Sequence, residues 1–245
     1  MSSVRIPRHV RSSVADHGGS VVLNLRTGRW HALNAPARQL WTELCRTGDF
    51  DDAVSSIAAG YPAEWRPRIR EDAETLLAAL SDRRLVVLGP RAEPAPADVD
   101  AESARPSTVV TATATATGAE GAERRIRAHV GLVLALLLLR LPFRWTTRTV
   151  AWTRRRCRTE ATVPEAIGML LAVDEAARRC PARAACLERS LGAVLTAALC
   201  GRRVDWVMGV AEDPYRFHAW LETRGAAVLS APEADLHTFR RVFVQ

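Results

Sequence analysis

The sequence contains no lysine, so arginine supplies the whole positive side of its charge. The 34 arginines outnumber 27 acidic residues, which leaves a net charge of +7. Complete use of one basic residue in place of the other indicates codon bias in a GC-rich genome. A basic chain can bind nucleic acid or an acidic peptide, but net charge alone does not select between these partners.

Long apolar segments are missing too. The one continuous apolar run, Val130–Leu139, has half of the ~20 residues that a transmembrane helix needs. We expect this run to lie in a buried helix over residues 125–141, with membrane contact that is peripheral at most. The first residues, Ser2–Pro7, lack the apolar core of a secretory signal peptide. The sequence therefore predicts a cytoplasmic protein.

The cysteines do not form a disulfide framework or a common metal-binding motif. Their number is odd, and the pair Cys180 and Cys186 does not have a usual zinc-ligand spacing. In a reducing cytoplasm we expect free thiols, and we expect neither a metal ion nor another cofactor. The five cysteines are Cys45, Cys157, Cys180, Cys186 and Cys200.

Residues 1–89 have the pattern of a small module of helices and strands. Ser20–Leu25 and Arg29–Leu33 are short strands, and Gly28 supplies the positive φ that the turn between them needs. Asn34 is the expected N-cap of a helix, and two amphipathic helices follow it. A hairpin covered by three helices is the arrangement of a winged-helix-type module. The predicted helices span residues 35–46, 51–59 and 64–81.

A winged-helix-type module in a basic chain raises the question of DNA binding. The third predicted helix mixes arginines with acidic residues, as in Arg66–Glu74. Such a mixture is typical of a solvated helix face and not of a surface that follows phosphates. We therefore expect no nucleic-acid partner.

The run VVLNLRTGRWHALNAPARQLW resembles the peptide-recognition modules related to PqqD, the small chaperone of pyrroloquinoline quinone biosynthesis. The resemblance covers roughly residues 4–89. It implies that a leader peptide adds as a strand to the hairpin edge, where unpaired N–H and C=O groups are available. We expect Trp41 to pack in the core. The implied leader-binding residues are Arg29, Trp30, His31, Ala32 and Leu33.

Residues 90–123 differ in composition from the sequence on either side. They are rich in proline, alanine, threonine and glycine, and they contain few large apolar residues. Such a segment cannot bury enough surface to offset the entropy of ordering, so we expect a flexible linker. A second domain of residues 124–245 follows. Within it, a capping box of Thr162 and Glu165 predicts a helix over residues 164–179.

Cys186 and His218 form the constellation that points to chemistry. Apolar residues at helical spacing predict a helix from Cys186 to Gly201, and the first turn of a helix favours a thiolate. A predicted strand over residues 216–223 carries His218. A thiol at a helix start beside a histidine is the geometry of a nucleophile and its base. A small core cysteine and a structural histidine would give the same pattern.

Two segments, CLERSLGAVLTAALCGRRVDWVMGV and FHAWLETRGAAVLS, resemble the transglutaminase-like cysteine peptidases that remove leader peptides from lasso-peptide precursors. The resemblance covers roughly Thr162–Ser230. It implies that Cys186 is the nucleophile and that His218 is the base. It also implies a papain-like or transglutaminase-like α+β fold for the second domain.

The third catalytic position departs from this family, because Ser230 stands where the family has an aspartate. If Arg224–Gly225 forms a tight turn, cross-strand pairing places His218 opposite residue 231, with Ser230 beside it. A serine can accept a hydrogen bond from imidazole but does not stabilise imidazolium as a carboxylate does. The downstream carboxylates of Glu233 and Asp235 are alternative candidates.

Taken together, these features predict an α+β leader peptidase of two domains joined by a linker. Residues 1–89 would hold the leader peptide of a precursor, and residues 124–245 would cleave the bond between leader and core. The resemblance also implies a separate ATP-dependent cyclase, similar to asparagine synthetase, as a partner. Two other functions stay open: a non-catalytic adaptor that presents the precursor to the cyclase, and an acyltransferase or transglutaminase that uses the same cysteine.

Overall fold

The computed structural model describes residues 3–14, 18–89, 108–111, 119–180, 184–211, 215–229 and 236–245. The chain divides into two compact units. The first comprises residues 1–25 and 29–101, and the second comprises residues 26–28 and 102–245. Each unit combines helices with a sheet, which confirms the predicted α+β class.

A three-stranded antiparallel sheet forms the base of the first unit. Its strands are β2 (Val10–Val14), β3 (Ser20–Asn24) and β4 (Arg29–Leu33), in the order β2-β3-β4. The predicted hairpin is β3–β4, and Gly28 in its turn has the expected positive φ of 71°. The sequence prediction omitted β2, which places β3 at the centre of the sheet and leaves β4 at one end.

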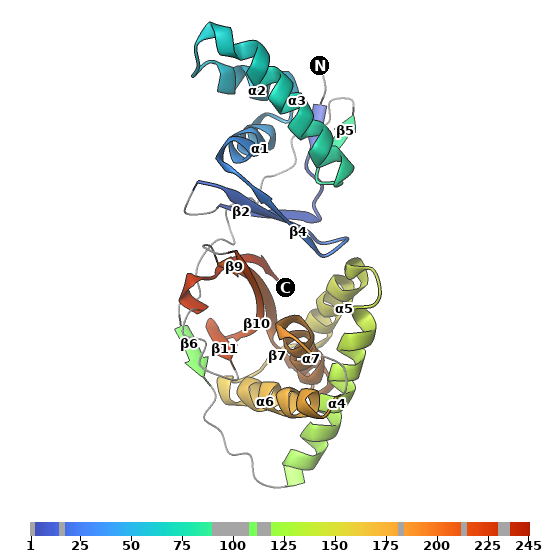
Figure 1. Cartoon of the computed structure of the whole chain (residues 1–245). Helices are drawn as coiled ribbons and strands as arrows, with labels where there is room; N and C mark the ends of the chain where they lie inside the picture. The colour runs from blue at the N-terminus through green and yellow to red at the C-terminus, as the bar shows by residue number, and fades with distance from the viewer. Residues whose placement is uncertain are drawn as a thin grey trace. The chain divides into compact units, whose positions relative to one another are not determined.

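The helices of the first unit lie on one side of its three-stranded sheet (Figure 1). They share a buried apolar cluster with this sheet, to which Val22 and Leu33 contribute from the strands. Trp41 is buried as expected, and its indole N–H donates to Ser12 Oγ at 3.2 Å. The Asn34 side chain accepts a hydrogen bond from the Ala37 N–H at 3.1 Å, as an N-cap should. The remaining elements are α1 (Ala35–Thr47), α2 (Phe50–Ala58), α3 (Arg66–Asp82) after a short 3₁₀ turn, and the paired strands β1 (Ser3–Arg5) and β5 (Val87–Gly89).

A five-stranded sheet forms the base of the second unit, in the order β12-β9-β10-β11-β6. Its antiparallel part contains β9 (Asp205–Ala211), β10 (Arg216–Thr223), β11 (Ala226–Leu229) and β12 (Arg240–Val244). The fifth strand, β6 (Thr108–Thr111), pairs with β11 in parallel. The strand that carries His218 therefore lies in the middle of the sheet.

The turn between β10 and β11 is the tight two-residue turn that the sequence predicts. Arg224 and Gly225 have φ angles of 52° and 76°, and Thr223 pairs with Ala226 across the turn. Two successive positive φ angles are typical of a type I′ hairpin turn. The Arg224 N–H also donates to Glu160 Oε1 at 2.8 Å.

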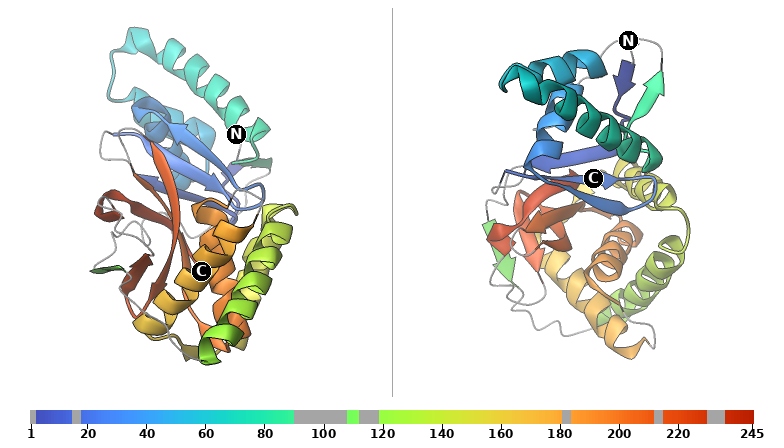
Figure 2. Two further views of the ribbon diagram at one scale, coloured as in Figure 1. Left: turned by 60° about the horizontal axis from the view of Figure 1, so that its bottom comes forward. Right: turned by 45° about the horizontal axis from the view of Figure 1, so that its top comes forward.

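The helices of the second unit lie on one side of this sheet (Figure 2). The helices that begin at Val163 and Cys186 contact its strands, and the helix that begins at Ala119 packs on those two helices. The helix that begins at Cys186 lies at the centre of the group, with Leu191 and Ala193 completely buried. The capping box of Thr162 and Glu165 is formed as predicted. The helices are α4 (Ala119–Leu138), α5 (Phe143–Arg156), α6 (Val163–Arg179) and α7 (Cys186–Leu199), and the short strands β7 (Thr159–Glu160) and β8 (Arg202–Arg203) pair beside them.

The predicted linker of residues 90–123 does not hold over its whole length. Strand β6 and the start of α4 at Ala119 both fall inside it. Thr108–Thr111 consists entirely of β-branched residues, which favour strands, and β11 supplies the strand with which it pairs. The boundaries at residues 89 and 124 stay predictions.

The apolar run in α4 is buried on one face only. Leu132 is 2% exposed, whereas Val133 and Leu137 are 52% and 57% exposed. The prediction of a buried helix is therefore correct for one face of α4 and wrong for the other. In the part of the chain that the structure describes, no helix combines the length and the apolar character needed to cross a bilayer.

Helices α4 and α7 approach each other through glycine, and this contact can be tested. A Cβ atom at Gly131 would lie 2.3 Å from Thr196 Oγ1 and 2.7 Å from the Gly192 carbonyl oxygen. We predict that Gly131→Ala forces the two helices apart and lowers the free energy of unfolding by about 1–3 kcal/mol. Chemical denaturation followed by circular dichroism measures this change.

Gly168 in α6 is the matched control for this substitution. A Cβ atom there meets only the flexible end of Arg124, at 3.1 Å from Nη1. Gly168→Ala should therefore leave the protein as stable as the parent, or stabilise it by up to about 1 kcal/mol through better helix propensity. Equal stabilities of the two alanine variants would contradict the close packing of α4 on α7.

Candidate active site

Cys186 is the first residue of α7, as the sequence predicts. The preceding Ala185 has no side-chain acceptor, but its N–H donates to the Glu188 carboxylate at 2.9 Å, which is one half of a capping box. The N–H groups of this first turn have no acceptor inside the helix. N–H groups in this position can donate hydrogen bonds to an anionic oxygen beside the thiol.

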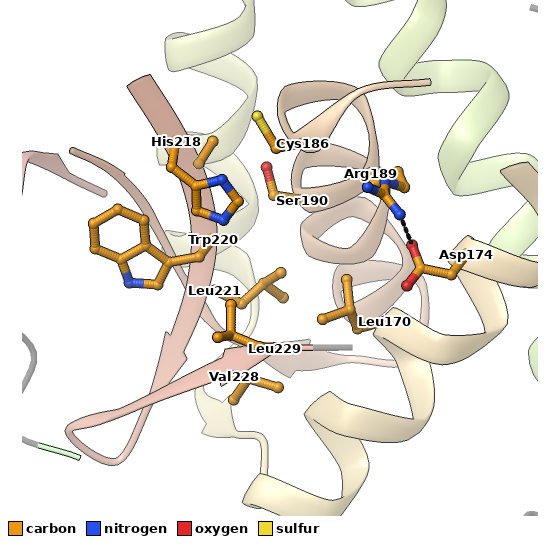
Figure 3. A pocket seen from close by; sticks show the side chains of 11 residues that line it. Leu170, Asp174, Cys186, Arg189, Ser190, His218, Trp220, Leu221, Val228 and Leu229 are labelled. Carbon is orange, nitrogen blue, oxygen red and sulfur yellow. Dashed lines mark hydrogen bonds and ion pairs between the residues drawn. The ribbon is translucent and has the colours of Figure 1, made fainter. Parts of the chain in front are cut away.

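Cys186 and His218 line the same pocket, with His218 on β10 and Cys186 on α7 (Figure 3). The cavity measures about 40 Å³. A space of that size holds water or a small group of atoms and not a whole peptide. The structure thus places the two residues that the sequence selects at the same pocket. The apolar part of the lining consists of Leu170, Ala219, Trp220, Leu221, Val228 and Leu229.

Polar contacts hold the first turns of α7 in place beside the pocket. The Ser190 hydroxyl accepts a hydrogen bond from Trp206 Nε1 at 3.0 Å and donates to the Leu187 carbonyl oxygen at 3.2 Å. Arg189 pairs with Asp174 of α6 at 3.3 Å, and the Asp174 side chain is only 7% exposed. Sequence reasoning did not single out Asp174, because the chain reaches this ion pair only by folding α6 against α7.

The His218 ring belongs to an aromatic cluster. It stacks on Trp220 with 6.0 Å between ring centroids and 14° between ring planes, and it lies 5.5 Å from the Phe239 ring. Trp220 Nε1 donates to Glu222 Oε1 at 2.8 Å, and Arg241 of β12 contacts both carboxylate oxygens of Glu222 at 2.9 and 2.8 Å. Sequence analysis missed Glu222, although its place two residues after Trp220 on a strand was a usable signal.

Three residues are the candidates for the third catalytic position. Ser230, Glu233 and Asp235 all lie outside the part of the chain that the structure describes. The pairing of β10 with β11 runs in the expected register from Thr223 and Ala226 to Leu221 and Val228. The roles of the three candidates therefore stay predictions.

The five residues predicted to bind a leader peptide form β4, the end strand of its sheet. Arg29 and Ala32 are exposed, Trp30 and His31 are partly buried, and Leu33 belongs to the core. Burial, followed by the positive charges of Arg83 and Arg29, lowers the pKa of His31. This edge thus combines a neutral imidazole at neutral pH with nearby arginines, a setting that suits an acidic side chain.

All five cysteines are free thiols. Among the residues that the structure describes, no group of three or more histidine, cysteine, aspartate or glutamate side chains is arranged to hold a metal ion.

Comparisons with known proteins match the two parts of the chain separately. Residues 19–86 match the family described as coenzyme PQQ synthesis protein D (PqqD), and residues 130–244 match the transglutaminase-like superfamily. The comparison with curated proteins finds no match. A solved structure described as TbiB1 in complex with the TbiA(beta) leader peptide is 29% identical, with a TM-score of 0.32. That match covers 36% of this chain and 99% of the other. The chain therefore carries a PqqD domain followed by a transglutaminase-like domain, the combination that the sequence resemblance predicts.

Proposed function

We propose that this protein binds the leader of a lasso-peptide precursor and hydrolyses the bond between leader and core by a thiol mechanism. The observation that carries the proposal is the common pocket of Cys186, at the start of α7, and His218, on β10. The match of residues 130–244 to the transglutaminase-like superfamily supports a cysteine-dependent reaction at this pair.

In the first half of the reaction, His218 takes the thiol proton while the Cys186 sulfur attacks the scissile carbonyl carbon. A carbon–sulfur bond forms, and the carbonyl oxygen becomes an oxyanion. The first-turn N–H groups of α7 donate to this oxygen. His218 then gives its proton to the amine of the core peptide, and the carbon–nitrogen bond breaks.

In the second half, water replaces the departed amine. His218 removes a proton from the water, whose oxygen attacks the thioester carbon. The carbon–sulfur bond breaks, the leader leaves as a carboxylic acid, and the thiol regains its proton. An amine in place of water would give acyl transfer with the same residues, so the acceptor that reaches the thioester decides between hydrolysis and transfer.

Leader binding is assigned to the first unit. A leader strand pairs with the outer side of β4, because this strand ends the sheet within the described residues and extended peptides add to the end strand of a sheet. Arg29 and Arg83 near His31 favour a leader with an acidic residue at this point. The match of residues 19–86 to PqqD supports this assignment.

The first prediction concerns the nucleophile. Cys186→Ala should reduce leader removal by on the order of 10³-fold or more, because no other group replaces the thiolate. Its free energy of unfolding should change by less than about 1 kcal/mol, since Cys186 is only partly buried. The measurement is mass spectrometry of a lasso-peptide precursor after incubation with the purified protein.

Cys200 is the matched control, because it lies at the opposite end of the same helix. Cys200→Ala should cleave at the parent rate. Normal cleavage by Cys186→Ala would reject the thiol mechanism. Intact precursor with the parent protein would favour the adaptor, and a mass that shows transfer to an amine would favour the acyltransferase.

The second prediction concerns the leader-binding edge. His31→Pro removes one backbone donor from β4 and should weaken binding of a synthetic leader about five- to tenfold. Strand N–H groups point alternately to the two sides, so Ala32→Pro is measured in parallel. Fluorescence anisotropy gives the affinity, and circular dichroism identifies any proline that disrupts the β3–β4 pairing.

His31→Val separates the backbone from the side chain, since it removes the imidazole but keeps the N–H and suits a strand. This variant should keep more of the leader affinity than His31→Pro, because the backbone donor is still present. If both proline variants remain folded and bind with unchanged affinity, the leader does not pair with β4.

A further inference from the structure

Three side chains of β10 form a continuous line that ends at the proposed base. His218, Trp220 and Glu222 are two residues apart, and alternate residues of a strand point to the same side of a sheet. The contacts agree with this geometry: the His218 ring stacks on the indole, and the indole N–H donates to the Glu222 carboxylate. The line continues onto β12 through the ion pair of Glu222 with Arg241.

The far end of this line is held rigidly. Arg241 contacts both oxygens of Glu222, and a two-point contact between a guanidinium and a carboxylate fixes their relative orientation. The Glu222 and Arg241 side chains are only 8% and 18% exposed, so water screens the interaction weakly. Glu222 Oε1 also accepts the indole hydrogen bond, which transmits the fixed orientation to Trp220.

The opposite side of the indole lies against backbone. A Cβ atom at Gly209 would be 2.5 Å from Trp220 Cη2 and 2.8 Å from Cζ3, so only glycine leaves the space that the ring occupies. Gly209 pairs with both His218 on β10 and Arg241 on β12. The Trp220 ring is completely buried and is thus confined by the carboxylate at one end and by the strand backbone at the other.

We propose that Glu222 and Arg241 are positioning residues, which hold the Trp220 indole as a fixed support for the His218 imidazole. This inference rests on the proposed role of His218 as the base. Its geometry suits that role, because a ring that must take a proton from a thiol and return it to an amine needs one orientation through both steps. Stacking on an aromatic face also stabilises the protonated imidazole.

The charges around His218 come from several elements. Cys186 and Arg189 of α7 line its pocket with Asp174 of α6, and Arg189 and Asp174 are paired with each other. On its own strand, Arg216 lies over the Phe239 ring at 5.5 Å. Beyond the indole stands the ion pair of Glu222 and Arg241. Loss of the indole support should therefore lower the pKa of His218, while Arg189, Asp174 and Arg216 stay in place.

The test replaces the ion pair as a whole, because removal of one partner would leave a buried charge. In Glu222→Leu/Arg241→Met both charges are exchanged for apolar side chains of similar length. We expect a folded protein in which the pKa of His218 falls by about half a unit, as NMR of labelled histidine measures. The turnover of precursor should fall about tenfold at unchanged KM, because the base is misaligned while the substrate still binds.

Alkylation of Cys186 by iodoacetamide supplies a readout that does not depend on cleavage. Its rate across the pH range in which thiols and imidazoles titrate reports the coupling of the thiol to His218. In the double variant the profile should shift with the pKa of His218. If the parent protein alkylates with such a profile but does not cleave precursor, the proposed function fails while the positioning role is still decided by the variant's profile.

Two further variants make the outcome decisive. Trp220→Phe keeps an aromatic ring but removes the N–H that Glu222 holds, so it should shift the His218 pKa and the alkylation profile in the same direction as the double variant. If the double variant does not fold, Trp220→Phe alone tests whether the indole supports the His218 imidazole. Arg202→Met is the control, since it removes an ion pair of the same unit, with Glu165 at 2.7 Å, that is not part of this line. Unchanged His218 pKa and alkylation profiles in both test variants would overturn the proposal.

Discussion

The position of α7 is the constraint on which the candidate site depends. One side of this helix meets α4 so closely that glycine is needed at Gly131, where any Cβ would meet the α7 backbone. Its other contacts include the hydrogen bond from Trp206 of β9 to Ser190 and the ion pair between Arg189 and Asp174. A helix held on several sides in this way cannot slide or rotate without breaking close packing. The site of the Cys186 thiol is therefore set by contacts made along the helix behind it.

The histidine side of the pocket is set differently, by the register of the sheet. A shift of β10 by one residue would turn His218 to the opposite face. The turn at Arg224–Gly225 fixes that register toward β11, and the pairing with β9 fixes it on the other side. Thus the start of α7 and the register of β10 place Cys186 and His218 at one small pocket. Each is determined by local rules and buried contacts. Helix packing and strand pairing together therefore give the pocket a defined geometry.

The sequence was sufficient where the structural signal is local. Asn34 as a helix cap, the capping box at Thr162, and the turn at Arg224–Gly225 all follow from side chains within a few residues, and all are formed. The start of α7 at Cys186 belongs to the same class. These elements placed both the thiol and the histidine without knowledge of the tertiary contacts.

The sequence was insufficient where partners are distant in the chain. Strand β6 was missed because four β-branched residues within a proline- and alanine-rich segment become a strand only beside β11. Helix α5 was not predicted from the sequence, since its arginines conceal an apolar stripe that includes Phe143 and Val150. Glu222 was overlooked because its meaning depends on Arg241, which folding brings from β12. In each case the missing information was a long-range contact.

The pairing of β6 with β11 also affects the solubility of the second unit when it is produced as a fragment. Ala226–Leu229 is a fully buried aliphatic strand, and in the intact chain β6 satisfies the backbone groups on one of its sides. A fragment cut after residue 111 would present that side to solvent as an open, uncharged edge. Such edges recruit strands from other molecules, so the shortened domain would be prone to aggregation even with every residue of its pocket present.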